Sequence, residues 1–241
     1  MIESVNNETI KNIRKLKDKK YRDETNLYFV EGDHLVLEAY KSGNLVKLIT
    51  TEDIYDFDVE KILVTDNVIN SISEMNNCKV IGIVKKQDSK LDLTKPVLIL
   101  DGIQDPGNLG TIIRSCVAFN INNLVLSDTS VDLYNTKSLR SAQGMNFYIN
   151  IVRENLIEII KSLKDEGYII YGTNVNNGND IKSIKTDGKY AIILGNEGNG
   201  ISSEVSSLVD KNIYIKMNEK CESLNVAVSG SIILYELENR W

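Results

Sequence analysis

Histidine and cysteine are scarce in this chain of 241 residues, and their scarcity excludes several kinds of site. His34 is the only histidine, and it lies far along the chain from the glycine-rich segments described below, which disfavours a catalytic histidine base. Cys78, Cys116 and Cys221 are isolated and form no Cys-x-x-Cys pair. We therefore expect no metal site, no disulfide framework and reduced thiols, as in a cytoplasmic protein.

Long apolar runs are absent as well. No run approaches the roughly 20 residues that cross a bilayer, and residues 1–8 are polar and acidic, so we expect neither a membrane span nor a signal peptide. Hydrophobic residues make up 42% of the chain and charged residues 26%, as in an ordinary globular protein of one large or two small domains. The net charge of −6 argues against a surface that is basic all over.

One segment near the N-terminus runs against this acidic balance. Basic residues crowd the first predicted helix and the residues after it, where they fit a patch that contacts phosphates. A run of exposed charge is more often the solvated face of a helix, so the residues alone leave both interpretations open. The basic cluster comprises Lys11, Arg14, Lys15, Lys17, Lys19, Lys20 and Arg22.

The hydrophobic pattern divides the chain at a polar segment. Residues 1–86 predict a small α/β unit. It begins with an amphipathic helix over residues 9–20, with Ile10, Ile13 and Leu16 on its apolar side, and continues with a second helix to residue 40 whose N-cap would be Asp33. Residues 87–95 are predicted to be a linker because they lack apolar periodicity. The second domain is predicted to span residues 96–241.

In the second domain, short apolar runs alternate with helical stretches. Continuous apolar strands that alternate with helices imply a mainly parallel sheet covered on both faces, and therefore an α/β fold. The strands are expected near residues 97–100, 123–126, 168–171, 191–194 and 213–215, and the helices near 112–119, 156–163, 203–208 and 226–237.

Three glycine-rich or polar segments follow predicted strands of this domain. They read ILDGIQDPGNLGTIIR (residues 99–114), LGNEGNG (194–200) and SLNVAV (223–228). Ligands of open α/β sheets bind at the carboxyl ends of the strands, so we expect the three segments to form one site. The first segment does not fit Gly-x-Gly-x-x-Gly, and the second lacks the Lys-Ser/Thr ending of a P-loop, which disfavours both phosphate-binding fingerprints.

Each segment carries side chains that suit a ligand and an ordinary turn alike. In the first, a helix that starts near Asn108 or Leu109 would place Arg114 one to two turns in, where its planar cation suits a phosphate. An Asn N-cap and a surface Arg explain the same residues. Glu197 in the second segment can accept hydrogen bonds from hydroxyl groups, pair with Arg114, or belong to a simple tight turn. Ser223 in the third fits the N-cap of the last helix.

Taken together and in this order, the three segments resemble the motifs of the SpoU-type RNA ribose 2′-O-methyltransferases of the SPOUT superfamily. The resemblance covers the whole chain. Residues 20–22 (KYR) and 29–32 (FVEG) resemble the substrate-binding domain of members that act on rRNA. The motifs are Asn108-x-Gly110-x-x-x-Arg114, the run from Leu194 to Gly200, and Ile215-x-Met217 followed by Ser223-Leu224-Asn225-Val226.

This resemblance implies a C-terminal α/β knot, a deep trefoil knot in which the last residues thread through a loop. It also implies a smaller N-terminal α/β RNA-binding domain, similar to ribosomal proteins that bind kinked RNA. The implied cofactor is S-adenosylmethionine, and the implied reaction is methylation of a ribose 2′-hydroxyl in RNA, with rRNA favoured. The family is usually a homodimer joined through the knot domain, and it implies neither a metal nor a membrane.

The resemblance also implies roles for single residues. Arg114 would act on the 2′-hydroxyl or, as we prefer, hold the adjacent phosphate and stabilise the developing alkoxide. Asn108 and Ser223 would orient ribose and phosphate, Asn225 would brace the site, and Glu197 would fix Arg114 or the first motif's loop. The implied cofactor-binding residues are Leu194, Gly195, Asn196, Gly198, Gly200, Ile215, Met217, Ser223, Leu224 and Val226. The implied RNA-binding residues are Lys11, Arg14, Lys15, Lys19, Lys20, Arg22 and Arg140.

Two positions depart from the family pattern in the third motif. Lys216 stands where the family usually has proline, and Glu219 stands where glycine is common. These departures keep open a non-catalytic RNA-binding or assembly factor that retains the knot. A methyltransferase that acts on tRNA is the second alternative.

Overall fold

The computed structural model describes residues 1–175, 177–185 and 189–238. The chain divides into two compact units, each described by itself below. Unit 1 comprises Met1–Asp88 and Asp132–Phe147, and unit 2 comprises Ser89–Val131 and Tyr148–Trp241. Unit 1 therefore includes a segment that the boundaries drawn from the sequence assign to the second domain.

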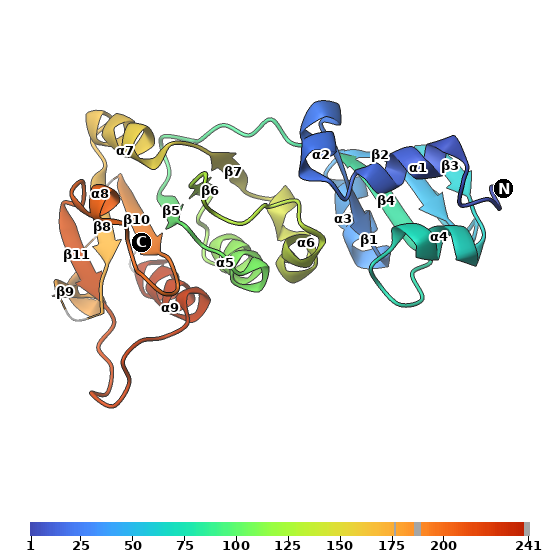
Figure 1. The fold of residues 1–241 in the computed structure, drawn as a ribbon. Coiled ribbons are helices and arrows are strands. Elements are labelled where there is room, and N and C mark those ends of the chain that lie inside the picture. Colours follow the sequence, from blue (N-terminus) through green and yellow to red (C-terminus); the bar gives the residue numbers. More distant parts are fainter. Residues whose placement is uncertain (176, 186–188, 239–241) are drawn as a thin grey trace. The chain divides into compact units, whose positions relative to one another are not determined.

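Unit 1 is a four-stranded sheet with helices on both faces (Figure 1). Successive residues of a strand point to opposite faces, so Phe29 packs in the core with α1 and α4, whereas Tyr28 and Val30 pack with α3. The strands lie in the order β1 (Leu27–Glu31), β4 (Val80–Lys85), β2 (Leu45–Thr50) and β3 (Glu60–Leu63), and the helices are α1 (Glu8–Lys15), α2 (Lys19–Thr25), α3 (Asp33–Lys41) and α4 (Asp66–Ile72).

The single helix predicted over residues 9–20 is wrong, because the chain forms two helices there. Asp18 caps α2 by accepting a hydrogen bond from the Lys20 amide (2.9 Å). The carbonyl oxygens of Leu16 and Lys17 accept from the Arg22 guanidinium, each at 2.7 Å. The break thus depends on a buried cation that the local pattern does not reveal. Asp33 is likewise not an N-cap but the first residue of α3.

The inserted segment of unit 1 forms the helix α6 (Thr136–Ala142) and a 3-10 turn (Met145–Phe147), neither of which the sequence predicted. Leu139 and Phe147 are buried in the same core as α3. Ion pairs join the segment to the rest of the unit. Arg22 pairs with Asp132, and Arg140 pairs with the buried Glu31 (3.0 Å) and with Glu74 (3.8 Å).

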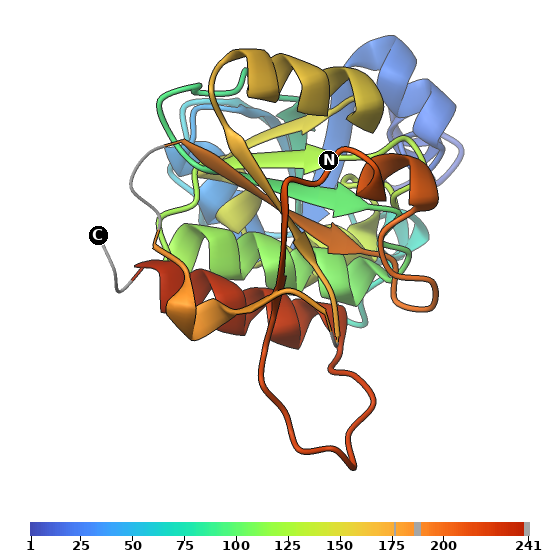
Figure 2. The ribbon, with the colours of Figure 1, turned by 90° about the vertical axis from the view of Figure 1, so that its left-hand side faces the viewer.

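Unit 2 contains a seven-stranded sheet whose strand pairs are all parallel, which confirms the predicted parallel α/β fold. Figure 2 shows α7 and α8 on one face of this sheet and α5 and α9 on the other. The strand order is β7 (Asn150–Arg153), β6 (Asn123–Leu126), β5 (Val97–Asp101), β10 (Tyr190–Gly195), β8 (Ile169–Thr173), β11 (Lys211–Tyr214) and β9 (Asn179–Asp180). The helices are α5 (Pro106–Ala118), α7 (Leu156–Asp165), α8 (Ser203–Ser206) and α9 (Val226–Glu238), with a 3-10 turn at Ile181–Ser183.

Helix α9 packs closely on the centre of the sheet and against α5. A Cβ atom at Gly230 would lie 2.7 Å from Leu194 Cδ1, so glycine permits this close approach. The knot implied by the family resemblance stays a prediction. None of the described helices is long and apolar enough to cross a membrane.

The structure moves the start of α5 from the predicted Asn108 or Leu109 to Pro106. Asp105 is the N-cap, and its side chain accepts a hydrogen bond from the Asn108 amide (2.9 Å). Proline fits the first helical position because that residue needs no amide donor. Arg114 consequently lies about two turns into the helix.

Candidate active site

The three sequence motifs meet at the carboxyl edge of the unit 2 sheet, as expected from their positions after parallel strands. Glu197 joins the loop after β10 to the motif-one loop, residues 102–105. Its carboxylate accepts hydrogen bonds from the backbone amides of Gln104 and Asp105, both at 3.2 Å, and from the Asn108 side chain at 2.9 Å. Glu197 therefore fixes the motif-one loop, and its described hydrogen bonds include none with Arg114.

Asn108 extends this network to the third motif. Its side-chain oxygen accepts a hydrogen bond from Asn225 Nδ2 at 3.0 Å. The Asn225 oxygen in turn accepts from the amides of Ala227 (2.9 Å) and Val228 (3.3 Å) and so caps α9. The prediction that Ser223 caps this helix is wrong, because the helix begins at Val226 and Asn225 supplies the cap. One chain of side chains, Glu197–Asn108–Asn225, thus links all three motifs.

The side chain of Asn196 holds the loop of the second motif in place by hydrogen bonds. Its side-chain nitrogen donates to the Gly102 carbonyl (2.7 Å), and its side-chain oxygen accepts from the Gly198 and Asn199 amides. A Cβ atom at Gly195 would lie 2.2 Å from the Gly200 carbonyl carbon. Only glycine fits there, because the loop folds back on itself at this point.

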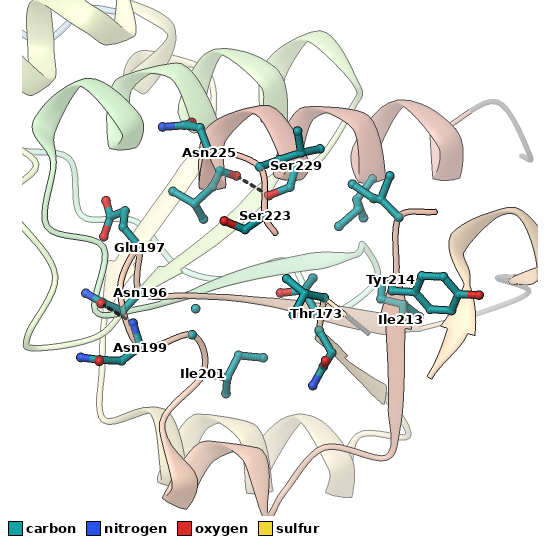
Figure 3. Close-up of a pocket in the computed structure, with 18 of the residues that line it drawn as sticks. Thr173, Asn196, Glu197, Asn199, Ile201, Ile213, Tyr214, Ser223, Asn225 and Ser229 are labelled. Atoms are coloured by element: carbon teal, nitrogen blue, oxygen red, sulfur yellow. Dashed lines mark hydrogen bonds between the residues drawn. The ribbon is translucent and has the colours of Figure 1, made fainter. Parts of the chain in front are cut away.

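The carboxyl edge holds a cavity of about 620 Å³. Figure 3 shows it between the loop at Asn196–Ile201, the ends of β8 and β11 near Thr173 and Ile213, and the residues around Ser223 and Asn225. Of the ten residues expected to bind the cofactor, nine line the cavity; Leu194 is buried and does not. Glu197 and Asn225 line it too.

Several lining residues were missed by the sequence reasoning. Three of them end or follow β8, namely Thr173, Asn174 and Val175. They could have been predicted, because ligands bind at the carboxyl ends of parallel strands and this strand was expected from the sequence. Asn199 lies within the second motif, but most of the other missed residues belong to none of the three motifs and reach the cavity only through the fold. Beyond β8, the missed residues are Asn199, Ile201, Ser206, Asn212, Ile213, Tyr214, Glu222, Ser229 and Ile233.

Arg114 lies on α5 with an exposed side chain. Within the described parts of the chain, its guanidinium has no hydrogen bond or ion pair, and it does not line the cavity. Asn108, one of its motif partners, is bonded to both other motifs. The motif-one arginine is thus left available to solvent beside an ordered network.

Glu197 is held in its ionised form. Partial burial opposes ionisation, but hydrogen bonds from Asn108 and from the backbone amides of Glu197, Asp105 and Gln104 outweigh it and lower the pKa below its ordinary value of 4.5. A negative charge at Glu197 therefore persists on the cavity wall at neutral pH.

The residues expected to bind RNA lie in unit 1 and differ in their availability. The side chains of Lys11, Lys15, Lys19 and Lys20 are exposed. Arg14 is half-buried and donates to the Val5 carbonyl (2.9 Å). The other two guanidinium groups are engaged by carboxylates, since buried Arg22 pairs with Asp132, and Arg140 pairs with Glu31 and Glu74.

Comparison with known proteins agrees with this geometry. A model of the SpoU rRNA Methylase family matches residues 95–235, and a model of the MRM3-like substrate binding domain matches residues 7–81. The chain belongs to the SpoU rRNA methylase family. This confirms the resemblance drawn from the three motifs. Among the described residues, no group of three or more His, Cys, Asp or Glu side chains is placed to hold a metal ion.

Individual relatives extend the match over nearly the whole chain. The 23S rRNA (guanosine(2553)-2′-O)-methyltransferase RlmP of Bacillus subtilis is 38% identical over 98% of both chains. The AdoMet-bound rRNA methyltransferase from Sinorhizobium meliloti superposes with a TM-score of 0.87 at 27% identity, covering 98% of this chain and 95% of that one. The SpoU methyltransferase AviRb from Streptomyces viridochromogenes has a TM-score of 0.88 at 22% identity over 97% and 98% of the two chains, and shows the shared fold.

Proposed function

We propose that this SpoU-family chain transfers a methyl group from S-adenosylmethionine to a ribose 2′-hydroxyl of rRNA. The observation that carries the proposal is the Glu197–Asn108–Asn225 network, which joins the first family motif to the second and third motifs, whose residues line one cavity. Support for the substrate comes from the RlmP relative, which is named for 2′-O-methylation of 23S rRNA and aligns over 98% of both chains.

The cavity fits the proposed cofactor in size and chemistry. Its volume of about 620 Å³ lies within the range of small-molecule sites. In the glycine-rich loop at 195–200, the amides of Asn196, Gly198, Asn199 and Gly200 donate within the loop, so its remaining carbonyl oxygens are the backbone groups proposed to hydrogen-bond an adenine edge. The charged side chains on the described wall are Glu197 and Glu222, with no Lys, Arg or His among the lining residues. A wall of this sign suits a cationic sulfonium.

When bound, S-adenosylmethionine supplies a methyl group that is activated by its sulfonium. The protein must align the 2′-hydroxyl with the bond that breaks, so positioning supplies much of the rate. Asn108 and Ser223 are proposed to orient ribose and phosphate. A guanidinium is hard to deprotonate, so Arg114 is assigned to hold the adjacent phosphate and stabilise the negative charge that develops on the ribose oxygen.

Two measurements test this function. Calorimetry is expected to show binding of S-adenosylmethionine, and a map of 2′-O-methylation across total RNA is expected to lose an rRNA site when the protein is absent. A lost tRNA site would favour the tRNA alternative. No cofactor binding at millimolar concentration would favour the non-catalytic factor. Lys216 and Glu219, which keep that alternative open, are exposed and do not line the cavity.

Unit 1 is proposed to bind the RNA through the exposed lysines of the basic cluster. Lys19 and Lys86 hydrogen-bond Asp23, which lowers the pKa of that carboxyl to about 2 and offsets part of the positive charge. Lys11 and Lys17 are exposed, and their ammonium groups have no ion pair within the described residues. Unlike the ammonium group of Lys15, those of Lys11 and Lys17 also make no side-chain hydrogen bond within the described residues, and these two lysines are therefore the proposed phosphate contacts of the cluster.

Charge reversal of Lys11 and Lys17 to glutamate is expected to weaken rRNA binding about tenfold at low salt and to reduce its salt dependence, because fewer counterions are released. Filter binding across a salt series measures both effects. Reversal of Lys182 and Lys185, exposed lysines of unit 2, is the matched control because it changes the net charge equally. Equal losses in the two variants would show that the cluster is only a solvated helix face.

A homodimer joined through unit 2 is also proposed. Val228 and Tyr235 are 48% and 53% exposed, and their spacing of seven residues places both on one face of α9. Phe119 at the end of α5 contacts the Tyr235 ring, so the apolar face spans both helices. A second copy of the same face would cover it. A cytoplasmic location, expected from the cysteine content, remains part of the proposal.

A further inference from the structure

Arg153 ends the edge strand β7, and its guanidinium lies against the loop that follows β6, residues 127–131. It donates to four carbonyl oxygens of this loop and, among the residues that the structure describes, to no carboxylate. One guanidinium can bind four carbonyl oxygens because its planar fork carries a positive charge and presents N–H donors in two directions. From Nη1 the distances are 2.5 Å to Ser127, 3.3 Å to Asp128 and 2.9 Å to Ser130, and from Nη2 the distance to Val131 is 2.8 Å.

The loop that Arg153 orders is joined to the motif-one loop along its length by hydrogen bonds. Three hydrogen bonds join them, two of which involve a side chain, so the position of one loop determines that of the other. The bonds run from Gly102 N to Ser127 Oγ (2.9 Å), from Gln104 Nε2 to the Thr129 carbonyl (2.7 Å) and from Val131 N to the Ile103 carbonyl (2.8 Å).

The motif-one loop presents its opposite edge to the active site. The Gln104 and Asp105 amides donate to Glu197, and Asp105 caps the helix that carries Asn108. Arg153 does not line the cavity. Three sets of hydrogen bonds therefore separate it from the cofactor site. They run from Arg153 to loop 127–131, from that loop to the motif-one loop, and from the motif-one loop to Glu197.

We propose that Arg153 is a positioning residue for methyl transfer. By fixing loop 127–131 it sets the motif-one loop, and with it the placement of Asn108 and Arg114 toward the ribose. The inference rests on the proposed function. Because Arg153 touches no lining residue in the described contacts, its loss is expected to slow turnover without changing cofactor affinity.

Arg153→Ala is expected to lower kcat on 23S rRNA by about 10- to 100-fold, since small misplacements of reacting groups have effects of this size. The dissociation constant for S-adenosylmethionine is expected to stay within about twofold of wild type, as only the motif-one side of the site moves. Arg153→Lys restores the charge without the fork and is expected to recover part of kcat. Lys164→Ala is the matched control, because it removes an ion pair with Asp210 (2.7 Å) in the same unit without contact to either loop.

Amide hydrogen exchange provides a readout that does not depend on activity. Residues 102–105 are expected to exchange faster in Arg153→Ala than in wild type or Lys164→Ala, and Arg153→Lys carries the comparison if the alanine variant does not fold. Unchanged kcat, or unchanged exchange at residues 102–105, would overturn the role of Arg153. A wild type that neither binds S-adenosylmethionine nor methylates rRNA overturns the proposed function instead, and the exchange data then decide the role of Arg153 alone.

Discussion

Arg114→Ala is expected to bind S-adenosylmethionine with wild-type affinity and to lose methyl transfer to rRNA by about 100-fold or more. The size follows from the role proposed for Arg114, because its loss would remove the cation that stabilises the negative charge developing on the ribose oxygen. Cofactor binding is expected to survive because Arg114 does not line the cavity and makes no described contact with the three-motif network. Single-turnover transfer of a labelled methyl group, together with calorimetry, measures the two effects separately.

Two further variants sharpen this test. Arg114→Lys keeps the charge but not the planar fork, so it is expected to retain more activity than the alanine variant. Lys161→Ala removes an exposed cation from α7 on the other face of the sheet and is expected to behave as wild type. Methylation by Arg114→Ala at the wild-type rate would refute the assignment.

Glu197→Gln is expected to reduce methyl transfer about 100-fold through misplacement of the motif-one loop. A carboxylate accepts from all three of its donors, at Gln104, Asp105 and Asn108, whereas an amide turns an NH₂ group toward one side of the same cluster. Glu204→Gln, on the exposed surface of α8, is the matched control. Wild-type turnover by Glu197→Gln would show that its hydrogen bonds do not govern the reaction.

The lowered pKa of Glu197 adds a pH signature to this prediction. The folded-state pKa is below the ordinary value of 4.5, so the stabilisation by the carboxylate is fully present above pH 4.5 and is lost as the pH falls through the lowered pKa. Denaturant unfolding of wild type and Glu197→Gln between neutral pH and pH 3 is expected to show a difference that shrinks on the acid side. A difference that grows toward low pH would contradict the ionised state.

The placement of the site followed from the sequence because it depends only on the strands being parallel. Gly102, Asn196 and the residues after β11 each follow a strand of a parallel sheet, and the carboxyl ends of such strands share one edge. The sequence could not decide between the two partners offered for Glu197. That choice depends on where α5 begins, and the Asp105 cap, three residues before the Asn108 side chain that Glu197 binds, starts the helix at Pro106.

The wrong predictions of helix ends arise where contacts between residues far apart in the sequence outweigh the local capping preferences. Ser223 and Asn225 are both good caps, and Asn225 takes the role because the same side chain also reaches Asn108, 117 residues away. The first helix ends at Lys15, where the Arg22 guanidinium binds the carbonyl groups of the next two residues, and Asp132, 110 residues further along, pairs with the same guanidinium. Local patterns contain no information about either partner.

The membership of Asp132–Phe147 in unit 1 has a consequence for how the chain is made. Leu139 and Phe147 complete the core around α3, so that core is still open when residue 88 leaves the ribosome. Synthesis must continue through β5, α5 and β6 before the missing side chains arrive. The N-terminal half of this protein therefore finishes folding only after the first catalytic motif has been translated, and a fragment cut at residue 88 lacks part of its own interior.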